Sequence, residues 1–194
     1  MLSIFGGALR RYLQARHALP ASALVAGVPV SVQGDGDLGG DRLSAMFVTL
    51  GTETADPMER LQIVHAHATG ARELQEALGG ETLLDWTEVF VPAVFSLGAK
   101  LLIDRKLLAR MPALCNAIVS NVPGPPMTVY LGGARLLAVH PLGPIFHGPA
   151  INLTVVSARD TIGFGLLSCP DLIPDLWELV DAIHAEFALY TGSA

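Results

Sequence analysis

The stretch NAIVSNVPGPPMTVYLGG, residues 116–133, decides how this chain is organised. Its first apolar run, Ala117–Val119, predicts a β-strand that ends at Ser120. Val122–Pro126 then carries three prolines and a glycine, and proline cannot donate a backbone hydrogen bond. We therefore expect neither a helix nor a ladder there. A second strand-like run follows at Met127–Leu131.

The prolines leave two interpretations of this segment open. Pro123, Pro125 and Pro126 fix their φ angles, so the segment is expected to be a stiff, shaped loop at a strand end. It is either a rigid connection between two strands or a preformed wall that a long apolar ligand passes. Ser120 and Asn121 offer hydroxyl and amide groups at the mouth of the loop, and in the second case Asn121 would fix the polar head of the ligand.

Outward from this stretch, the periodicity of apolar residues predicts further strands and helices. Ile151–Val155 and Ile162–Leu166 each alternate apolar with polar or glycine residues, which predicts a hairpin that turns at Arg159-Asp160. Asp56 before Pro57 predicts a capped helix start.

The other expected elements are helices at Leu2–Arg16 and Leu83–Leu108, strands at Val25–Val32 and Arg42–Leu50, a stripe of Leu61, Val64, Ala68, Ala71, Leu74 and Leu78 on the helix after Asp56, and a last helix opened by Asp171 and Pro174 with Trp177, Val180, Ile183, Phe187 and Tyr190 inward. For Pro29 we expect an edge position or a bulge. The order of elements predicts the α/β (α+β) fold class, with a two-layer mixed sheet and helices.

The composition is unusually apolar and weakly charged. Hydrophobic residues make up 51% of the 194 residues and charged ones 15%, with a net charge of −6. Scattered basic residues in a net acidic chain argue against nucleic acid as a partner. Val89–Ala99 carries no charge at all. The apolar excess indicates either a large core or a surface that faces a partner domain or a lipid.

The motifs that usually bind phosphates or metals give little support to such sites. Residues 34–39 match G-x-G-x-x-G, but two aspartates would repel a pyrophosphate and a strand is expected to follow. His65 and His67 lie two apart on a helix and cannot share a metal, and Cys115 and Cys169 form no ligand motif, so we expect no metal site. His147 could line a pocket beside a loop rich in proline and glycine.

Several segments, in order along the chain, resemble one family. Ser120–Pro125 reads Ser-Asn-Val-Pro-Gly-Pro, and Val28–Val32 reads Val-Pro-Val-Ser-Val. Gly40–Val48, Asp56–Leu61 and Pro170–Asp175 agree as well. Together they resemble the C-terminal domain of the bacterial wax ester synthase/diacylglycerol acyltransferase family. This resemblance implies one half of a chloramphenicol-acetyltransferase-like, CoA-dependent acyltransferase.

The resemblance also implies a reaction. It would move a fatty acyl group from acyl-CoA, a co-substrate and not a bound cofactor, to diacylglycerol or a long-chain alcohol. In the family a His-His-x-x-x-Asp-Gly motif in the N-terminal half supplies the base, and no histidine of this chain is followed four residues later by aspartate. We therefore expect residues 1–194 to be the C-terminal domain without the N-terminal catalytic one, and inactive alone. No catalytic residue carries over.

The residues that do carry over are Ser120, Asn121, Pro123, Gly124 and Pro125, as a loop expected near the domain interface and the acyl channel. The expected partners are the N-terminal half, on the same or another chain, and the lipid substrates. We expect a cytoplasmic location, with at most peripheral contact with a membrane or lipid droplet. The alternative is a non-catalytic module of the same fold that binds lipid or a partner.

Overall fold

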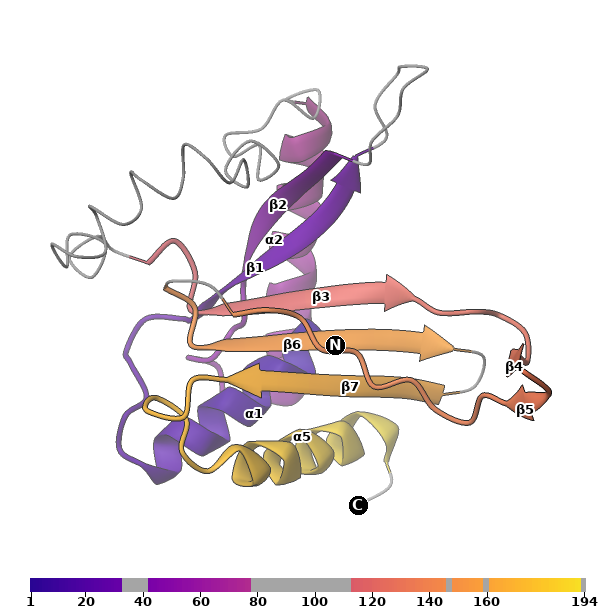
Figure 1. The fold of residues 1–194 in the computed structure, drawn as a ribbon. Coiled ribbons are helices and arrows are strands. Elements are labelled where there is room, and N and C mark those ends of the chain that lie inside the picture. The colour runs from indigo at the N-terminus through magenta and orange to yellow at the C-terminus, as the bar shows by residue number, and fades with distance from the viewer. Residues whose placement is uncertain (33–41, 78–112, 146–147, 159–160, 193–194) are drawn as a thin grey trace, which may run out of the picture.

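The protein is built on a five-stranded mixed sheet in the order β2-β1-β3-β6-β7 (Figure 1). The computed structural model describes residues 1–32, 42–77, 113–145, 148–158 and 161–192. The strands are β1 (Val25–Val32), β2 (Arg42–Thr49), β3 (Ala117–Pro123), β6 (Ile151–Ala158) and β7 (Thr161–Ser168). Strand β3 runs parallel to both β1 and β6, while β2 and β7 are antiparallel to their neighbours. The sheet confirms the mixed two-layer prediction and the hairpin after residue 151.

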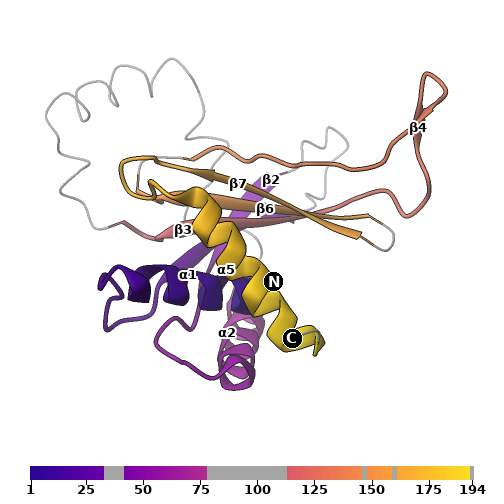
Figure 2. The same cartoon turned by 90° about the horizontal axis from the view of Figure 1, so that it is seen from below.

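Three helices lie on one side of the sheet, as Figure 2 shows. They are α1 (Leu2–Ala15), α2 (Pro57–Ala77) and α5 (Leu176–Thr191). The predicted start of α2 is confirmed, because the Asp56 carboxylate accepts a hydrogen bond from the Glu59 backbone N–H at 2.8 Å. The motif at 34–39, the helix expected at 83–108, the uncharged run at 89–99 and His147 lie outside the described residues.

The hydrophobic core lies between the helices and the sheet. Alternate residues of β3 and β6 point into it, which is the period-two pattern of a half-covered strand. Its buried members include Phe5, Leu9 and Tyr12 of α1, Ala117 and Val119 of β3, Ile151, Leu153 and Val155 of β6, and Leu179 and Ile183 of α5.

An ionic cluster is buried in the helical layer. Glu186 of α5 contacts Arg60 of α2, and their side chains are 3% and 1% exposed. The second carboxylate oxygen of Glu186 accepts a hydrogen bond from Arg11 at 2.5 Å. Arg60 also donates to the carbonyl oxygens of Ser3 and Thr54, at 3.2 and 3.0 Å. Because a Cβ on residue 7 would lie 2.1 Å from Glu186, only glycine fits α1 beside this cluster.

The sheet opens between β1 and β3. The two strands pair only at Ala26–Ala117 and Gly27–Ile118, and Figure 1 shows β1 and β2 bending away beyond that point. Asn116 donates to the Val25 carbonyl oxygen at 2.8 Å, so alternation along β1 directs the ring nitrogen of Pro29 toward β3.

Pro123 occupies the corresponding place on the other strand. Gly124 donates to the Ser157 carbonyl oxygen of β6 at 2.8 Å, so alternation directs the ring nitrogen of Pro123 toward β1. Neither proline can donate to a ladder, and the strands separate where pairing would need those donors. Pro29 thus stands at a locally open edge, in agreement with the edge position expected for it.

Beyond β3 the chain leaves the sheet. It forms a separate hairpin, β4 (Tyr130–Leu131) and β5 (Ala134–Arg135), which projects from the end of the sheet in Figure 1. The hairpin turns at Gly132 and Gly133, whose φ angles of 57° and 83° suit a type I′ turn. The chain then returns across the face of the sheet opposite the helices (Figure 2).

Three expectations about these elements are wrong. Strand β3 continues through Ser120 to Pro123, because β6 pairs with it along that length and the prolines need no donor on the open side. Of the run Met127–Leu131, only the last two residues form a strand. Trp177 and Phe187 of α5 are 80% and 41% exposed and do not face inward.

The apolar stripe expected on α2 is also wrong in part. Val64 is buried, but Leu61 and Leu74 are 38% and 62% exposed. The helix instead turns Arg60 inward, where Glu186 and backbone carbonyl oxygens satisfy its guanidinium group. The buried face of α2 therefore contains Arg60, whose charge has partners there, while Leu61 and Leu74 remain exposed.

Candidate functional site

The five predicted site residues lie where β3 ends and the chain leaves the sheet. Ser120, Asn121 and Pro123 belong to β3, and Gly124 and Pro125 follow it. Val119 points into the core beneath the helices, so alternation places Asn121 on the helical side of the sheet and Ser120 on the other side. The two side chains therefore point to opposite faces of the sheet.

The polar groups of this segment are available to a ligand. Asn121 is exposed and Ser120 is half-buried, and neither side chain makes a hydrogen bond within the described part of the chain. Gly124 is held closely, because a Cβ there would lie 2.8 Å from the Ser157 carbonyl oxygen. The segment is therefore anchored to β6, while the backbone of Asn121 lies along the open edge between β1 and β3.

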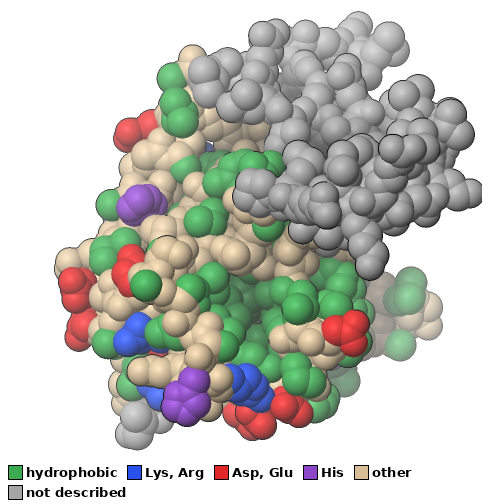
Figure 3. Space-filling model, turned by 90° about the vertical axis from the view of Figure 1, so that its left-hand side faces the viewer, with side chains coloured by type: hydrophobic (Ala, Val, Ile, Leu, Met, Phe, Trp, Pro, Cys, Tyr) green, Lys and Arg blue, Asp and Glu red, His purple; other side chains and the backbone are tan. Residues whose placement is uncertain are grey.

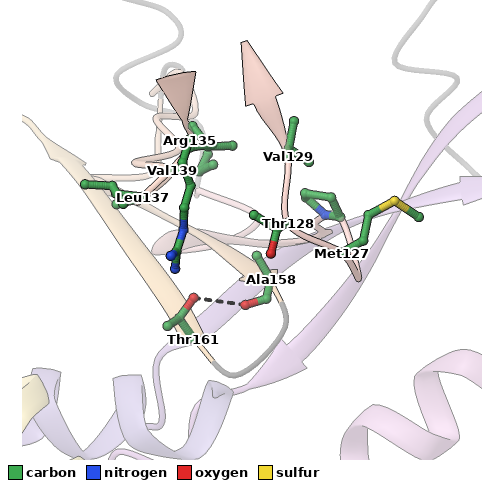
Figure 4. A pocket seen from close by; sticks show the side chains of 11 residues that line it. Met127, Thr128, Val129, Arg135, Leu137, Val139, Ala158 and Thr161 are labelled. Atoms are coloured by element: carbon green, nitrogen blue, oxygen red, sulfur yellow. Dashed lines mark hydrogen bonds between the residues drawn. The ribbon is translucent and has the colours of Figure 1, made fainter. Parts of the chain in front are cut away.

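Next to this segment lies a pocket of about 190 Å³, shown in Figure 4. It lies between the chain that runs out to the hairpin and the ends of β6 and β7 at Ala158 and Thr161, and Pro125 is the one predicted site residue that lines it. The wall includes Met127, Val129, Leu137 and Val139. The pocket thus joins a predicted site residue to an apolar surface.

Three polar side chains line this pocket, those of Thr128, Arg135 and Thr161. In Figure 4 the guanidinium group of Arg135 extends toward Thr161, whose hydroxyl group donates to the Ala158 carbonyl oxygen at 2.9 Å. Arg135 is exposed and pairs with no carboxylate in the part of the chain that the structure describes. An apolar wall with one cation at its rim suits an apolar chain that carries an anionic or polar group. The sequence analysis missed Arg135, although it is the only charged residue between Gly124 and Gly143.

The described residues show no arrangement for proton transfer or metal binding. Among residues 1–32, 42–77, 113–145, 148–158 and 161–192, no three His, Cys, Asp or Glu side chains gather as a metal site. His140 is exposed, and no ion pair orients it within these same residues. Burial raises the pKa of the Cys115 thiol, although a hydrogen bond with the Gly27 backbone partly opposes this, so Cys115 is a poor nucleophile.

The charges on the described surface are mixed in sign. On the face shown in Figure 3, the Lys and Arg side chains lie beside acidic ones and form no continuous basic field. Arg16, for example, pairs with Asp175 and Glu178 at 3.1 and 2.8 Å. No helix among the described elements is both long enough and apolar enough to span a bilayer.

Comparisons with known proteins point to one family. Residues 39–190 match the family described as the WS/DGAT C-terminal domain. A protein of Mycobacterium tuberculosis that bears the name of a diacylglycerol O-acyltransferase is 36% identical over 182 residues, which are 93% of this chain and 36% of that protein. The O-acyltransferase WSD of Acinetobacter baylyi is 28% identical over 193 residues, or 99% of this chain and 41% of that protein.

A solved structure has the same fold. The wax ester synthase/diacylglycerol acyltransferase of Marinobacter aquaeolei VT8 matches with a TM-score of 0.67 and 28% identity, over 98% of this chain and 42% of that one. The likeness confirms the acyltransferase fold that the resemblance of the sequence implied. The chain spans 36% to 42% of the length of these three proteins.

Proposed function

Because the chain belongs to the wax ester synthase/diacylglycerol acyltransferase family and carries its C-terminal domain, we propose that it forms part of an O-acyltransferase. The enzyme would transfer a fatty acyl group from acyl-CoA to the hydroxyl group of diacylglycerol or a long-chain alcohol. The ester C–O bond forms, the thioester C–S bond breaks, and CoA leaves as the thiol. The observation that carries this proposal is the match over residues 39–190.

The proton of the acceptor hydroxyl group needs a base, and the motif that supplies it in the family is missing from this sequence. A base must lie within hydrogen-bond reach of that proton, and none of the six histidines has an aspartate four residues later as in the motif of the family. In our proposal the base comes from the region of the enzyme that carries His-His-x-x-x-Asp-Gly. This chain would then be inactive without that region. The proposal is supported by the chain's coverage of only 41% and 42% of two relatives.

The contribution of this domain would be a wall of the substrate channel. The backbone of β3 lies along the opening between β1 and β3, the Asn121 side chain points to the helical side of the sheet, and Pro125 leads into the apolar pocket beside Arg135. Such a surface can hold an acyl chain in place while the reaction occurs elsewhere, because positioning a reactant lowers the entropic part of the barrier.

Reconstitution tests this proposal. The coding sequence around this domain is searched for His-His-x-x-x-Asp-Gly, and the region that encodes the motif is expressed with and without this chain. Transfer of radiolabelled palmitate from palmitoyl-CoA to dioleoylglycerol or hexadecanol is then measured. We expect product only when both regions are present. Product from this chain alone, or none from the two together, contradicts the proposal.

The exposed apolar side chains beyond β3 favour a second candidate, a non-catalytic module that binds lipid or a partner. This candidate requires that the chain by itself bind palmitoyl-CoA or fatty acid and that no combination with the other region produce ester. Calorimetric titration of the purified chain with palmitoyl-CoA, together with the transfer assay, separates the two functions.

A further inference from the structure

The segment from Gly124 to Gly143, here called the apolar arm, projects from the sheet with most of its side chains exposed. It leaves the sheet after β3, forms the β4–β5 hairpin and returns to the sheet (Figures 1 and 2). Every residue from Tyr130 to His140 is exposed. A hairpin with two residues in each strand is marginal in water unless something packs against it.

The apolar arm exposes large apolar side chains of the kind that usually lie in a protein core. Leu131 is 84% exposed, Leu137 81%, Met127 69% and Tyr130 62%. Large apolar side chains gathered on one projecting element mark a contact surface more often than scattered ones do. Tyrosine and methionine are also enriched in protein interfaces. The arm thus has the composition of a surface that another body covers.

Both ends of the apolar arm are fastened to the sheet. At its start, the Gly124 N–H donates to the Ser157 carbonyl oxygen at 2.8 Å. At its return, a Cβ on residue 165 would lie 1.5 Å from the Pro141 carbonyl oxygen, so the arm rests directly on the β7 backbone. Just beyond it, the Asn152 amide donates to the Pro144 carbonyl oxygen at 2.8 Å. Fixed ends lower the entropic cost of docking the tip.

The low charge of the apolar arm helps to decide whether a membrane or another protein covers it. Arg135 is its only charged residue, and the whole chain carries a net charge of −6. Attachment to an anionic lipid surface normally needs several Lys or Arg side chains beside the apolar ones. The cores of protein interfaces are instead depleted of charge. The arm therefore favours a protein partner over a membrane.

We propose that the apolar arm is the element by which this domain docks onto the rest of the acyltransferase, with Tyr130 and Leu131 as its central contacts. This inference rests on the proposed function. The chain matches only 36% to 42% of the length of its relatives, so a body larger than this domain accompanies it in those proteins. A specific interface buries about 800 Å² on each partner, and the arm offers a continuous apolar run for it.

Photocross-linking tests the inference in the cells that make this protein. p-Benzoylphenylalanine replaces Leu131 and, as the control, Arg72, whose side chain on α2 is 76% exposed. Mass spectrometry identifies the linked peptides. We expect the Leu131 position to link to the region that carries His-His-x-x-x-Asp-Gly and the Arg72 position not to do so. Links only to lipid, only to a second copy of this domain, or no more than the control overturn the inference.

Two serine variants give an independent measurement. Tyr130→Ser and Leu131→Ser remove exposed side chains, so the melting temperature of the purified chain should stay the same. Each variant should weaken binding to the partner region at least about 30-fold, as the loss of a central contact does. Unchanged binding of both variants contradicts the inference.

Failure of the docking inference can be told from failure of the proposed function. If the arm links to the partner region but the assembly transfers no palmitate, the docking stands and the proposed function fails. If the assembly transfers palmitate while the serine variants bind normally, the proposed function stands and the docking inference fails.

Discussion

Replacing Glu186 with glutamine should reveal how much the buried ionic cluster contributes to stability. The change keeps the shape of the side chain and removes its charge. Glu186 is 3% exposed and is the acidic partner of both Arg60 and Arg11 in the described structure. Arg60 is 1% exposed, so its positive charge would remain buried without a counter-charge. Arg11 is 50% exposed and would be solvated instead.

The expected magnitude follows from the contacts that survive. Breaking a buried ion pair by removing one partner costs about 3–5 kcal/mol of unfolding free energy. Arg60 keeps its hydrogen bonds to the carbonyl oxygens of Ser3 and Thr54, so we expect the lower end, about 3 kcal/mol. For a chain of this size, about 2–4 °C of melting temperature is lost per kcal/mol, which predicts a decrease of about 6–12 °C.

Urea and thermal unfolding followed by circular dichroism measure this loss. The matched control is Glu178→Gln, because Glu178 pairs with Arg16 at 2.8 Å but its side chain is 62% exposed. An exposed pair contributes about 0–1 kcal/mol, so the control should be nearly neutral. The double variant Arg60→Met with Glu186→Met should recover part of the stability that Glu186→Gln loses. If Glu186→Gln is no more destabilising than Glu178→Gln, the reasoning is wrong.

Two further predictions concern packing and reactivity. Gly165→Ala should destabilise the protein by about 2 kcal/mol, because its Cβ would lie 1.5 Å from the Pro141 carbonyl oxygen. Gly70→Ala on α2 should stabilise it by about 0.5–1 kcal/mol, because nothing lies within 4 Å of that Cβ. Equal effects of the two variants in urea unfolding would refute this prediction. Cys115 should react with iodoacetamide at pH 8 at least about tenfold more slowly than Cys169, because burial limits access and raises the pKa of Cys115. Because the pKa of Cys115 is raised in the folded protein, its contribution to stability is complete below the ordinary thiol pKa and is lost as pH rises through the raised value. Equal alkylation rates of Cys115 and Cys169, measured by mass spectrometry, would contradict the predicted difference in reactivity.

The elements that depend on short-range chemistry were predictable from the sequence. The alternation in β6 and β7 and the Asp56 cap of α2 each act within a few residues. The ordered resemblance to the acyltransferase domain was readable for the same reason, because its segments are continuous in the chain. The predicted site segment, Ser120–Pro125, lies at one strand end as expected.

Tertiary structure alone decided which faces are covered. Helix α5 carries apolar residues on more than one side, so periodicity could not tell that Glu186 would be buried and Trp177 left 80% exposed. The partners of Glu186 are Arg11 and Arg60, which are distant in sequence, and only the packing of α1, α2 and α5 brings them together. The same holds for Arg135, which meets Thr161 only because the chain beyond β3 returns across the sheet. Burial is a property of neighbours in space, and a sequence records neighbours along the chain.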